Sequence, residues 1–146
     1  MDDWKSYSRM TLQRDLVLSK SHIDILKKHA KQNQPNESCA ILFGRNEEEK
    51  FSVTDVFLTE NMAASPVNFT ISNEELIKAY QESEKKNLEV IAIFHSHPDS
   101  AAYPSLTDRQ YMEVNPIPWV IYSNVNDEIR AYILESALVP INVRVL

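Results

Sequence analysis

The fold of this chain is decided by Leu88-Glu89-Val90-Ile91-Ala92-Ile93-Phe94-His95-Ser96-His97-Pro98. The first seven of these residues are rich in β-branched side chains and almost entirely apolar, which is typical of a central strand covered on both faces. The strand leads directly into two histidines, and Pro98 ends it. Because side chains at positions i and i+2 of a strand point the same way, we expect both imidazoles to lie together at its end.

Two imidazoles at this spacing can bind one metal ion. A catalytic zinc site uses three protein ligands and leaves one position open for water. Asp108, eleven residues after His97, is the candidate third ligand, and Glu37 supplies a further carboxylate upstream. Two other interpretations stay open. The histidines can be ordinary polar residues at a strand end, or they can belong to a non-haem iron site, which also uses two histidines and a carboxylate.

The segment Ser105-Leu106-Thr107-Asp108 also matches a helix capping box. In that interpretation Ser105 and Asp108 only begin a helix, which we expect from 106 to 113. The capping and metal interpretations are compatible, because an aspartate in a first helical turn is held rigidly and can still face a metal. Glu37, considered by itself, is more typical of a solvated charge at a strand edge.

Length and composition indicate a single soluble domain. The chain has 146 residues, of which 43% are hydrophobic and 25% charged, as in ordinary globular proteins. Cys39 is the only cysteine, which excludes a disulfide framework and a multi-thiolate zinc site. The longest apolar runs are too short to cross a bilayer, and the start of the chain lacks a secretory pattern. We therefore expect a cytoplasmic protein with no membrane partner.

The charge of the chain bears on its partners. Its formal net charge is −6, which argues against general nucleic-acid binding through phosphate neutralisation. An acidic enzyme of this kind is better suited to a neutral or basic protein surface.

Periodicity predicts the order strand, helix, two strands, helix, strand, short helix and two or three strands. The expected strands are 11–18, 38–43, 50–58, 88–94, 119–122 and 129–134, with 138–146 either a further strand or irregular. Residues 1–10 are expected to form a flexible leader, and residues 11–146 a single domain. This order is typical of an α/β protein with one mixed sheet and helices packed against it.

Two longer helices are expected to begin at the capping patterns Ser21-x-x-Asp24 and Ser72-x-x-Glu75. The apolar residues expected on their buried faces are Ile23, Leu26 and Ala30 in the first helix and Leu76, Ile77 and Tyr80 in the second. His22 and His29, in the first helix, are expected at the surface.

The histidine pair occurs in several metalloenzyme families, and the rest of the chain argues against most of them. Cupins need a glutamate a few residues after the pair and many glycines, whereas Gly44 is the only glycine here. Metallo-β-lactamase-like enzymes continue to Asp-His, where this chain has Asp99-Ser100. Those folds and the barrel amidohydrolases are also larger, and zinc deaminases need paired cysteines.

One family matches the whole pattern. His95-Ser96-His97-Pro98, with seven residues between His97 and Ser105 before Ser105-Leu106-Thr107-Asp108, resembles the JAMM motif of the JAB/MPN+ metallopeptidases. The upstream Glu37-Ser38-Cys39-Ala40-Ile41-Leu42-Phe43-Gly44 is similar to the glutamate strand of that family, with Ala40 where many relatives carry glycine. Asn61, Phe69 and the helix begun by Ser72 resemble its middle section. The resemblance runs from about residue 12 to about residue 134, and is greatest to the compact archaeal or bacterial deubiquitinase-like members.

The resemblance implies a fold and a site. The fold would be a single α+β MPN/JAMM domain, cytidine-deaminase-like and three-layered, with a mixed β-sheet flanked by helices. His95, His97 and Asp108 would bind Zn²⁺. Glu37 would act as general base and acid, and the Ser105 hydroxyl would stabilise the oxyanion.

The resemblance also implies an activity and partners. The chain would be a zinc-dependent isopeptidase that hydrolyses the C-terminal peptide or isopeptide bond of ubiquitin or a ubiquitin-like modifier. Its partners would be that modifier and its conjugates, with a homodimer or proteasome association as further possibilities. Two alternatives stay open: a peptidase that processes ubiquitin-like sulfur-carrier proteins, and a non-enzymatic MPN assembly module.

Overall fold

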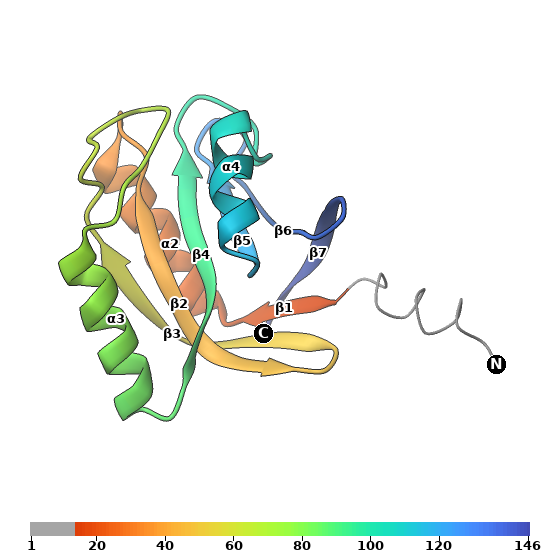
Figure 1. Ribbon diagram of the computed structural model, residues 1–146. Coiled ribbons are helices and arrows are strands. Elements are labelled where there is room, and N and C mark those ends of the chain that lie inside the picture. Colours follow the sequence, from red (N-terminus) through yellow and green to blue (C-terminus); the bar gives the residue numbers. More distant parts are fainter. Residues whose placement is uncertain (1–13) are drawn as a thin grey trace.

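The computed structural model describes residues 14–146, so the expected leader 1–10 and residues 11–13 of the first expected strand lie outside the described part. Ten elements follow one another in the described part (Figure 1): β1 (Asp15–Leu18), α2 (Lys20–Asn33), β2 (Cys39–Glu47), β3 (Lys50–Thr59), α3 (Asn73–Lys85), β4 (Glu89–His97), α4 (Leu106–Val114), β5 (Trp119–Ser123), β6 (Glu128–Leu134) and β7 (Leu138–Val145). The expected order of elements is confirmed, and the tail forms a strand.

The strands form one mixed sheet in the order β1-β3-β2-β4-β5-β6-β7. β4 pairs with β5 in parallel, and β1 pairs in parallel with both β3 and β7. The remaining neighbours are antiparallel. The contacts of β1 with two strands close the sheet into a barrel, a feature that no local pattern in the sequence indicates.

The helices cover opposite faces of this sheet, which confirms the three-layer arrangement. In Figure 1, α2 lies behind β2 and β4, while α4 lies in front of β5. The buried face of α2 contains Ile23, Leu26 and Ala30, and it packs in one cluster with β2 and β4 residues such as Leu42 and Phe94. On the other face, α3 and α4 contribute to two smaller clusters.

Alternation along β2 and β4 assigns each side chain to one of these layers. On β4, Ala92 and Phe94 belong to the cluster that contains α2, whereas Ile93 lies with the α3 and α4 clusters. Because side chains alternate along a strand, His95 and His97 face the same side as Ile93. On β2, Cys39 and Ile41 likewise lie on the α3 and α4 side.

The helix ends and faces differ in part from the expectation. The N-cap of α2 is Ser19, whose hydroxyl accepts a hydrogen bond from the His22 N–H, so the helix begins earlier than Ser21. In α3, Ile77 and Tyr80 were expected to be buried, but each is 58% exposed. Ala79 and Ser83 are the buried residues of this helix instead, and Leu76 is partly buried against the cluster of Ile41, Phe43 and Ala79.

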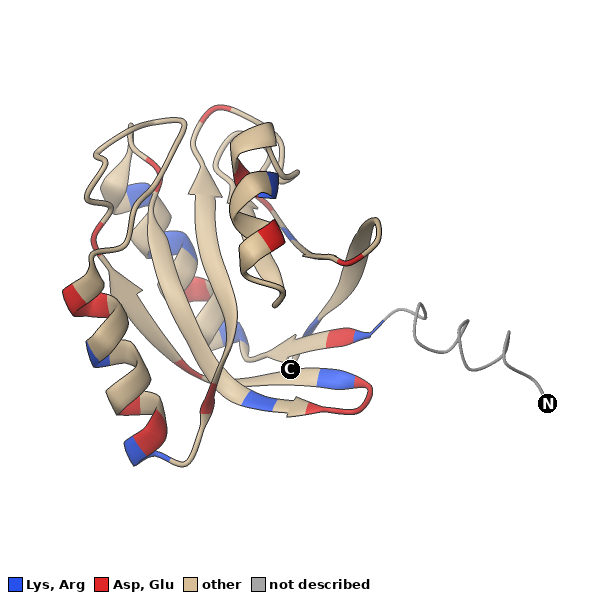
Figure 2. Ribbon diagram, viewed as in Figure 1, with Lys and Arg blue, Asp and Glu red and all other residues tan. Residues whose placement is uncertain are grey.

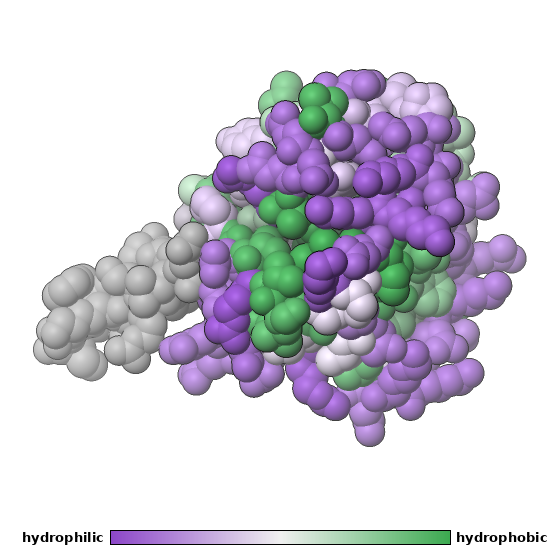
Figure 3. All heavy atoms as spheres, turned by 180° about the vertical axis from the view of Figure 1, so that it is seen from behind, coloured by the Kyte–Doolittle hydropathy of each residue, from purple (hydrophilic) through white to green (hydrophobic). Residues whose placement is uncertain are grey.

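Apart from Glu37 and Asp108, which are buried, the charged residues lie around this core rather than in it. They gather on the helices and on the β2–β3 hairpin, while β5 carries none and β4 only Glu89 (Figure 2). The reverse face of the molecule is largely hydrophilic around a central apolar group (Figure 3). Within residues 14–146, we find no helix whose length and apolar character would allow it to span a membrane.

Gly44 allows a close approach between β2 and β3. A Cβ atom at this position would lie 1.8 Å from the backbone oxygen of Ser52, next to the irregularity in the β2–β3 register. We expect Gly44→Ala to lower the free energy of unfolding by about 1–3 kcal/mol, because the strand backbone must move. Urea unfolding measures this, with the exposed Arg45→Ala as control, which should stay within about 0.5 kcal/mol of the parent. Equal stability of both variants would contradict the prediction.

Candidate metal centre and active site

Two elements bring three possible metal ligands together. His95 and His97 end β4, and Asp108 lies in the first turn of α4. The Nε2 atoms of the two histidines are 3.1 Å apart, and Asp108 Oδ2 lies 3.1 Å from the first and 3.0 Å from the second. All three residues are buried. The three side chains therefore converge on one small volume.

The donor atoms fit a metal ion. The Nδ1–H of His97 donates to the Ala101 carbonyl at 2.8 Å, which leaves the Nε2 lone pair of His97 free for a ligand bond. With bonds of about 2.0–2.1 Å, a tetrahedral zinc site has ligand atoms about 3.3 Å apart, close to the separations found here. Two nitrogen lone pairs and a carboxylate oxygen at such distances repel one another unless a proton or a cation lies among them. His95, His97 and Asp108 could therefore hold a divalent metal.

Aromatic residues hold the His95 ring in place. Phe69, from the loop between β3 and α3, stacks on this imidazole with centroids 4.9 Å apart and planes at 23°. Trp119, at the start of β5, meets it edge-on at 5.8 Å. His95 is completely buried, and its Nδ1 has no hydrogen-bond partner within residues 14–146. Burial lowers the pKa of His95, which favours the neutral form that a metal requires.

Glu37 lies beside this group because of strand register. Cys39 of β2 is paired with His95 of β4, and the pairing continues through a hydrogen bond from the Ser96 N–H to the Ser38 carbonyl at 3.0 Å. Glu37 is therefore placed opposite His97, on the same face of the sheet. Its Oε2 is 4.0 Å from the Nε2 of His97, and its Oε1 is buried without a hydrogen-bond partner in the part of the chain that the structure describes.

Two serines fix this register. The hydroxyl of Ser96 accepts hydrogen bonds from the Ser38 N–H at 2.8 Å and from the Ser38 hydroxyl at 2.9 Å. Both residues are completely buried and lie on the sheet face opposite the metal ligands. The hydroxyl groups of both serines thus have a partner, and the segment that carries Glu37 is attached directly to the strand that carries the histidines.

Burial and neighbouring groups shift the pKa values of the two carboxyl groups in the site. Burial raises the pKa of Glu37 to about 8, with His97 opposing and Asp108 adding to the rise. Burial alone would also raise the pKa of Asp108, but hydrogen bonds from both imidazoles and from the Ser105 N–H hold it well below its usual range. Asp108 is thus kept as an anion, while Glu37 is set up to exchange a proton near neutrality.

Ser105 caps α4 and is also exposed to solvent. It is the N-cap of α4, and the expected capping box is confirmed: its hydroxyl accepts from the Asp108 N–H at 3.0 Å, and its N–H donates to Asp108 Oδ2 at 2.9 Å. Ser105 is exposed, unlike Asp108. The hydroxyl only accepts in the capping bond, so its proton is available to a group that enters from solvent.

Structure adds residues that sequence reasoning did not assign to the site. These are the Ala101 carbonyl, Trp119 and Ser38, which support the candidate ligands. Ser96, the partner of Ser38, lies within the motif itself, where the resemblance implies that it shapes the site; alternation along the strands could have indicated that both serines lie in the layer behind the ligands. No pattern along the chain indicates the Ala101 carbonyl.

His29 was expected at the surface, but it is partly buried and connects α2 to the sheet. Its Nε2 lies 3.0 Å from the Cys39 carbonyl and 3.1 Å from the Thr59 carbonyl. Both partners are acceptors, so this nitrogen must carry the proton. His29 therefore links α2 to the paired ends of β2 and β3, close to Glu37, which precedes β2 in the sequence.

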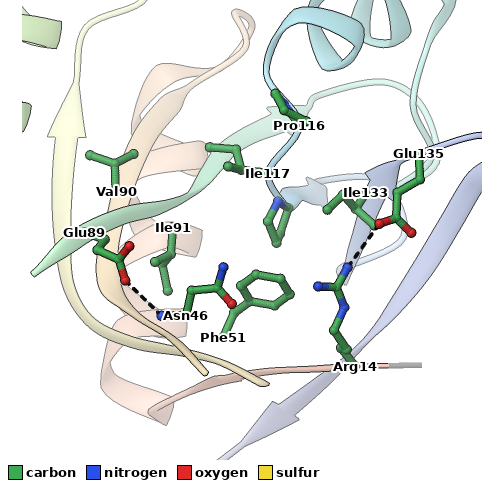
Figure 4. A pocket seen from close by; sticks show the side chains of 11 residues that line it. Arg14, Asn46, Phe51, Glu89, Val90, Ile91, Pro116, Ile117, Ile133 and Glu135 are labelled. Carbon is green, nitrogen blue, oxygen red and sulfur yellow. Dashed lines mark hydrogen bonds and ion pairs between the residues drawn. The ribbon is translucent and has the colours of Figure 1, made fainter. Parts of the chain in front are cut away.

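A pocket at the opposite end of β4 is a weaker candidate for a functional site (Figure 4). Arg14 pairs with Glu135 at 3.5 Å and lies over the Phe51 ring, while Glu89 accepts a hydrogen bond from the Asn46 N–H. The charges of this pocket are therefore largely engaged with one another. Glu89 and His97 lie eight positions apart along β4, which places the pocket about 26 Å from the candidate metal ligands.

Comparison with known families settles the relationship of the chain. The family described as prokaryotic homologs of the JAB domain matches residues 19–135, a range that includes Glu37, Ser105 and the three candidate metal ligands. This chain is a member of that family. The resemblance noted in the JAMM motif is therefore confirmed.

Comparisons of this JAB-domain protein with individual relatives are consistent with its family membership. It is 40% identical over 100 residues to the desampylase of Pyrococcus furiosus, and the aligned part covers 68% of each protein. It is 27% identical over 134 residues to the CysO-cysteine peptidase of Mycobacterium tuberculosis, covering 88% of this chain and 90% of that protein. A solved structure from Desulfitobacterium hafniense has a TM-score of 0.82 at 24% identity, covering 90% and 92% of the two chains, and supports the fold.

Proposed function

We propose that this JAB-domain protein is a zinc-dependent peptidase that hydrolyses the peptide or isopeptide bond at the C-terminus of a ubiquitin-like modifier. The observation that carries the proposal is the buried Glu37 carboxylate, 4.0 Å from His97 Nε2 and beside a convergent set of two histidines and an aspartate. The relatives named desampylase and CysO-cysteine peptidase support this substrate class. A cation bound here would leave room for water on the side that Glu37 faces.

His95, His97 and Asp108 would hold the zinc. Bound zinc would polarise the scissile carbonyl and lower the pKa of a neighbouring water toward about 7. Glu37 takes the proton of the attacking water, whose oxygen bonds to the carbonyl carbon, and later donates a proton to the leaving amine as the C–N bond breaks. The pKa of Glu37, raised by burial to about 8, suits a group that must both accept and donate near neutral pH.

The Ser105 hydroxyl would donate to the oxygen of the developing tetrahedral centre. We expect Ser105→Ala to lower kcat by about 10²–10³, the usual loss when one oxyanion donor is removed. The variant also loses a helix cap, which costs about 1 kcal/mol. Ser19→Ala removes the corresponding cap of α2 and is the control for stability alone. Steady-state kinetics check this prediction, and an equal kcat in Ser105→Ala and Ser19→Ala would contradict it.

A second candidate function is the processing of a ubiquitin-like sulfur carrier. It is favoured by the CysO-cysteine peptidase, since that alignment covers most of both proteins. The two functions share one chemistry and differ in the leaving amine, which is a lysine side chain in an isopeptide and an α-amine in a processed carrier.

The test combines metal analysis with cleavage assays. Purified protein is analysed for zinc content and is offered two kinds of substrate: modifier–lysine conjugates and modifiers with an α-linked residue at the C-terminus. We expect one zinc per chain and release of the intact modifier from one kind at least. Zinc-loaded protein that cleaves neither would refute the proposal, as would cleavage that persists undiminished after the zinc is removed by a chelator.

A further inference from the structure

The backbone N–H and carbonyl of Glu37 bond to a loop, whereas the pairing with β4 reaches only to Ser38. Glu37 precedes the first paired residue of β2, Cys39. Its N–H donates to the Ser65 carbonyl at 2.9 Å, and its carbonyl accepts from Asn61 Nδ2 at 2.9 Å. Both partners belong to residues 60–72, the loop between β3 and α3, which we call the 60–72 loop. The position of Glu37 therefore depends on this loop.

Asn61 organises the 60–72 loop through its side chain. Besides the Glu37 carbonyl, its Nδ2 donates to the Asn68 carbonyl at 2.9 Å. Its Oδ1 accepts from the N–H groups of Ala63 and Thr70, each at 3.0 Å. The residue is only 7% exposed. Both amide protons and both oxygen lone pairs of Asn61 are thus used. Its Nδ2 also lies 3.5 Å from the Ser65 carbonyl, so all five contacts go to backbone groups, of which four belong to the loop and one to Glu37.

The same loop supports one of the candidate metal ligands. Phe69, which stacks on His95 at 4.9 Å, follows Asn68, whose carbonyl Asn61 binds. The start of the loop is fixed independently, because Glu75 of α3 accepts the Glu60 N–H at 3.0 Å. Asn61 is therefore the point at which the loop, Glu37 and the surroundings of His95 are connected.

We infer that Asn61 is a positioning residue for Glu37. The Nδ2 of Asn61 fixes the position of the Glu37 main chain just before β2. That position determines the distance between the Glu37 carboxylate and His97. The Oδ1 contacts stabilise the fold of the loop. The Nδ2 contact with the Glu37 carbonyl affects the reaction through the position of Glu37. This inference rests on the proposed function, since it assigns Glu37 the transfer of protons.

Asn61→Asp removes the donor contacts of Asn61 and keeps its acceptor contacts. An aspartate has the same shape and still accepts from the N–H groups of Ala63 and Thr70, but it cannot donate to the carbonyls of Glu37, Asn68 and Ser65. We expect kcat to fall about 10- to 100-fold, since a displacement of about 1 Å in a catalytic group costs up to about 10² in rate. KM should stay within about twofold, and the zinc content should stay at the parent value, because neither the ligands nor the outer surface changes.

Ser65→Ala is the matched control. It removes a side-chain contact within the loop, the bond from the Val67 N–H to Ser65 Oγ, and leaves the backbone carbonyl that binds Glu37. This variant should keep the parent kcat and KM. If Asn61→Asp also kept the parent kcat, or raised KM alone, or lost activity only in proportion to lost zinc or lost folded protein, Asn61 would not position Glu37.

Amide hydrogen exchange gives a readout that needs no substrate. In Asn61→Asp we expect faster exchange at the Glu37 N–H, while the Thr70 N–H stays protected. An unchanged exchange rate at Glu37 would overturn the inference. Because wild-type protein that cleaves no modifier refutes only the proposed function, the exchange experiment distinguishes failure of the positioning role from failure of that function.

Discussion

Replacing Glu37 by glutamine is expected to leave the metal bound and to lower kcat by about 10²–10⁴, the range that general acid–base catalysis contributes. Glutamine has nearly the same shape, so the attachment of this segment to β4 through Ser38 and Ser96 stays intact. It cannot accept the proton of the attacking water or donate one to the leaving amine. KM should change little, because the Glu37 side chain is only a few per cent exposed and offers little surface to a bound modifier.

The measurement is steady-state cleavage of a modifier conjugate, with zinc content determined on the same preparation. Glu74→Gln, on the exposed first turn of α3, removes an equal charge away from the site and should keep the parent kcat. A Glu37→Gln protein that is both zinc-loaded and fully active would remove Glu37 from the mechanism. Loss of zinc in this variant would instead make Glu37 part of the ligand set.

The convergence of the site could be predicted because it follows from local rules. Alternation along a strand places His95 and His97 on one face, and a capping box fixes Asp108 in the first turn of a helix. The resemblance to the JAMM motif connected Glu37 to them. The chemical roles of these residues stay predictions, and the structure supplies the distances on which the proposed roles rest.

Other features could not be predicted because they depend on tertiary packing. Hydropathy favours Ile77 and Tyr80 on the buried face of α3, but the residues that the packing buries there are Ala79 and Ser83, with Leu76 partly buried beside them. Closure of the sheet depends on the short strand β1, whose partners are distant in sequence. The hydrogen bonds of Asn61 likewise depend on the folded course of a loop that has no periodic pattern.

The largest loss is expected when a candidate metal ligand is removed. His97→Ala should abolish stoichiometric zinc binding and reduce cleavage to the uncatalysed level, whereas Glu37→Gln loses only proton transfer. His97 is the more informative histidine, because its Nδ1–H is fixed by the Ala101 carbonyl at 2.8 Å and its Nε2 lies near both Asp108 and Glu37. Such an oriented ring contributes to affinity both as a ligand and through its hydrogen bond.

Thermal unfolding with and without zinc tests this independently of any substrate. A metal that binds only the folded state stabilises it by about 2.7 kcal/mol at a hundredfold excess over its dissociation constant. Zinc should therefore raise the Tm of the parent and of the control His22→Gln, which changes a histidine outside the site. It should have no such effect on His97→Ala. One zinc per chain in His97→Ala, with the same rise in Tm, would show that the ion is held by other residues. The proposed roles of Asp108 and Glu37 would then lose their basis as well, because both are argued from their distances to His97.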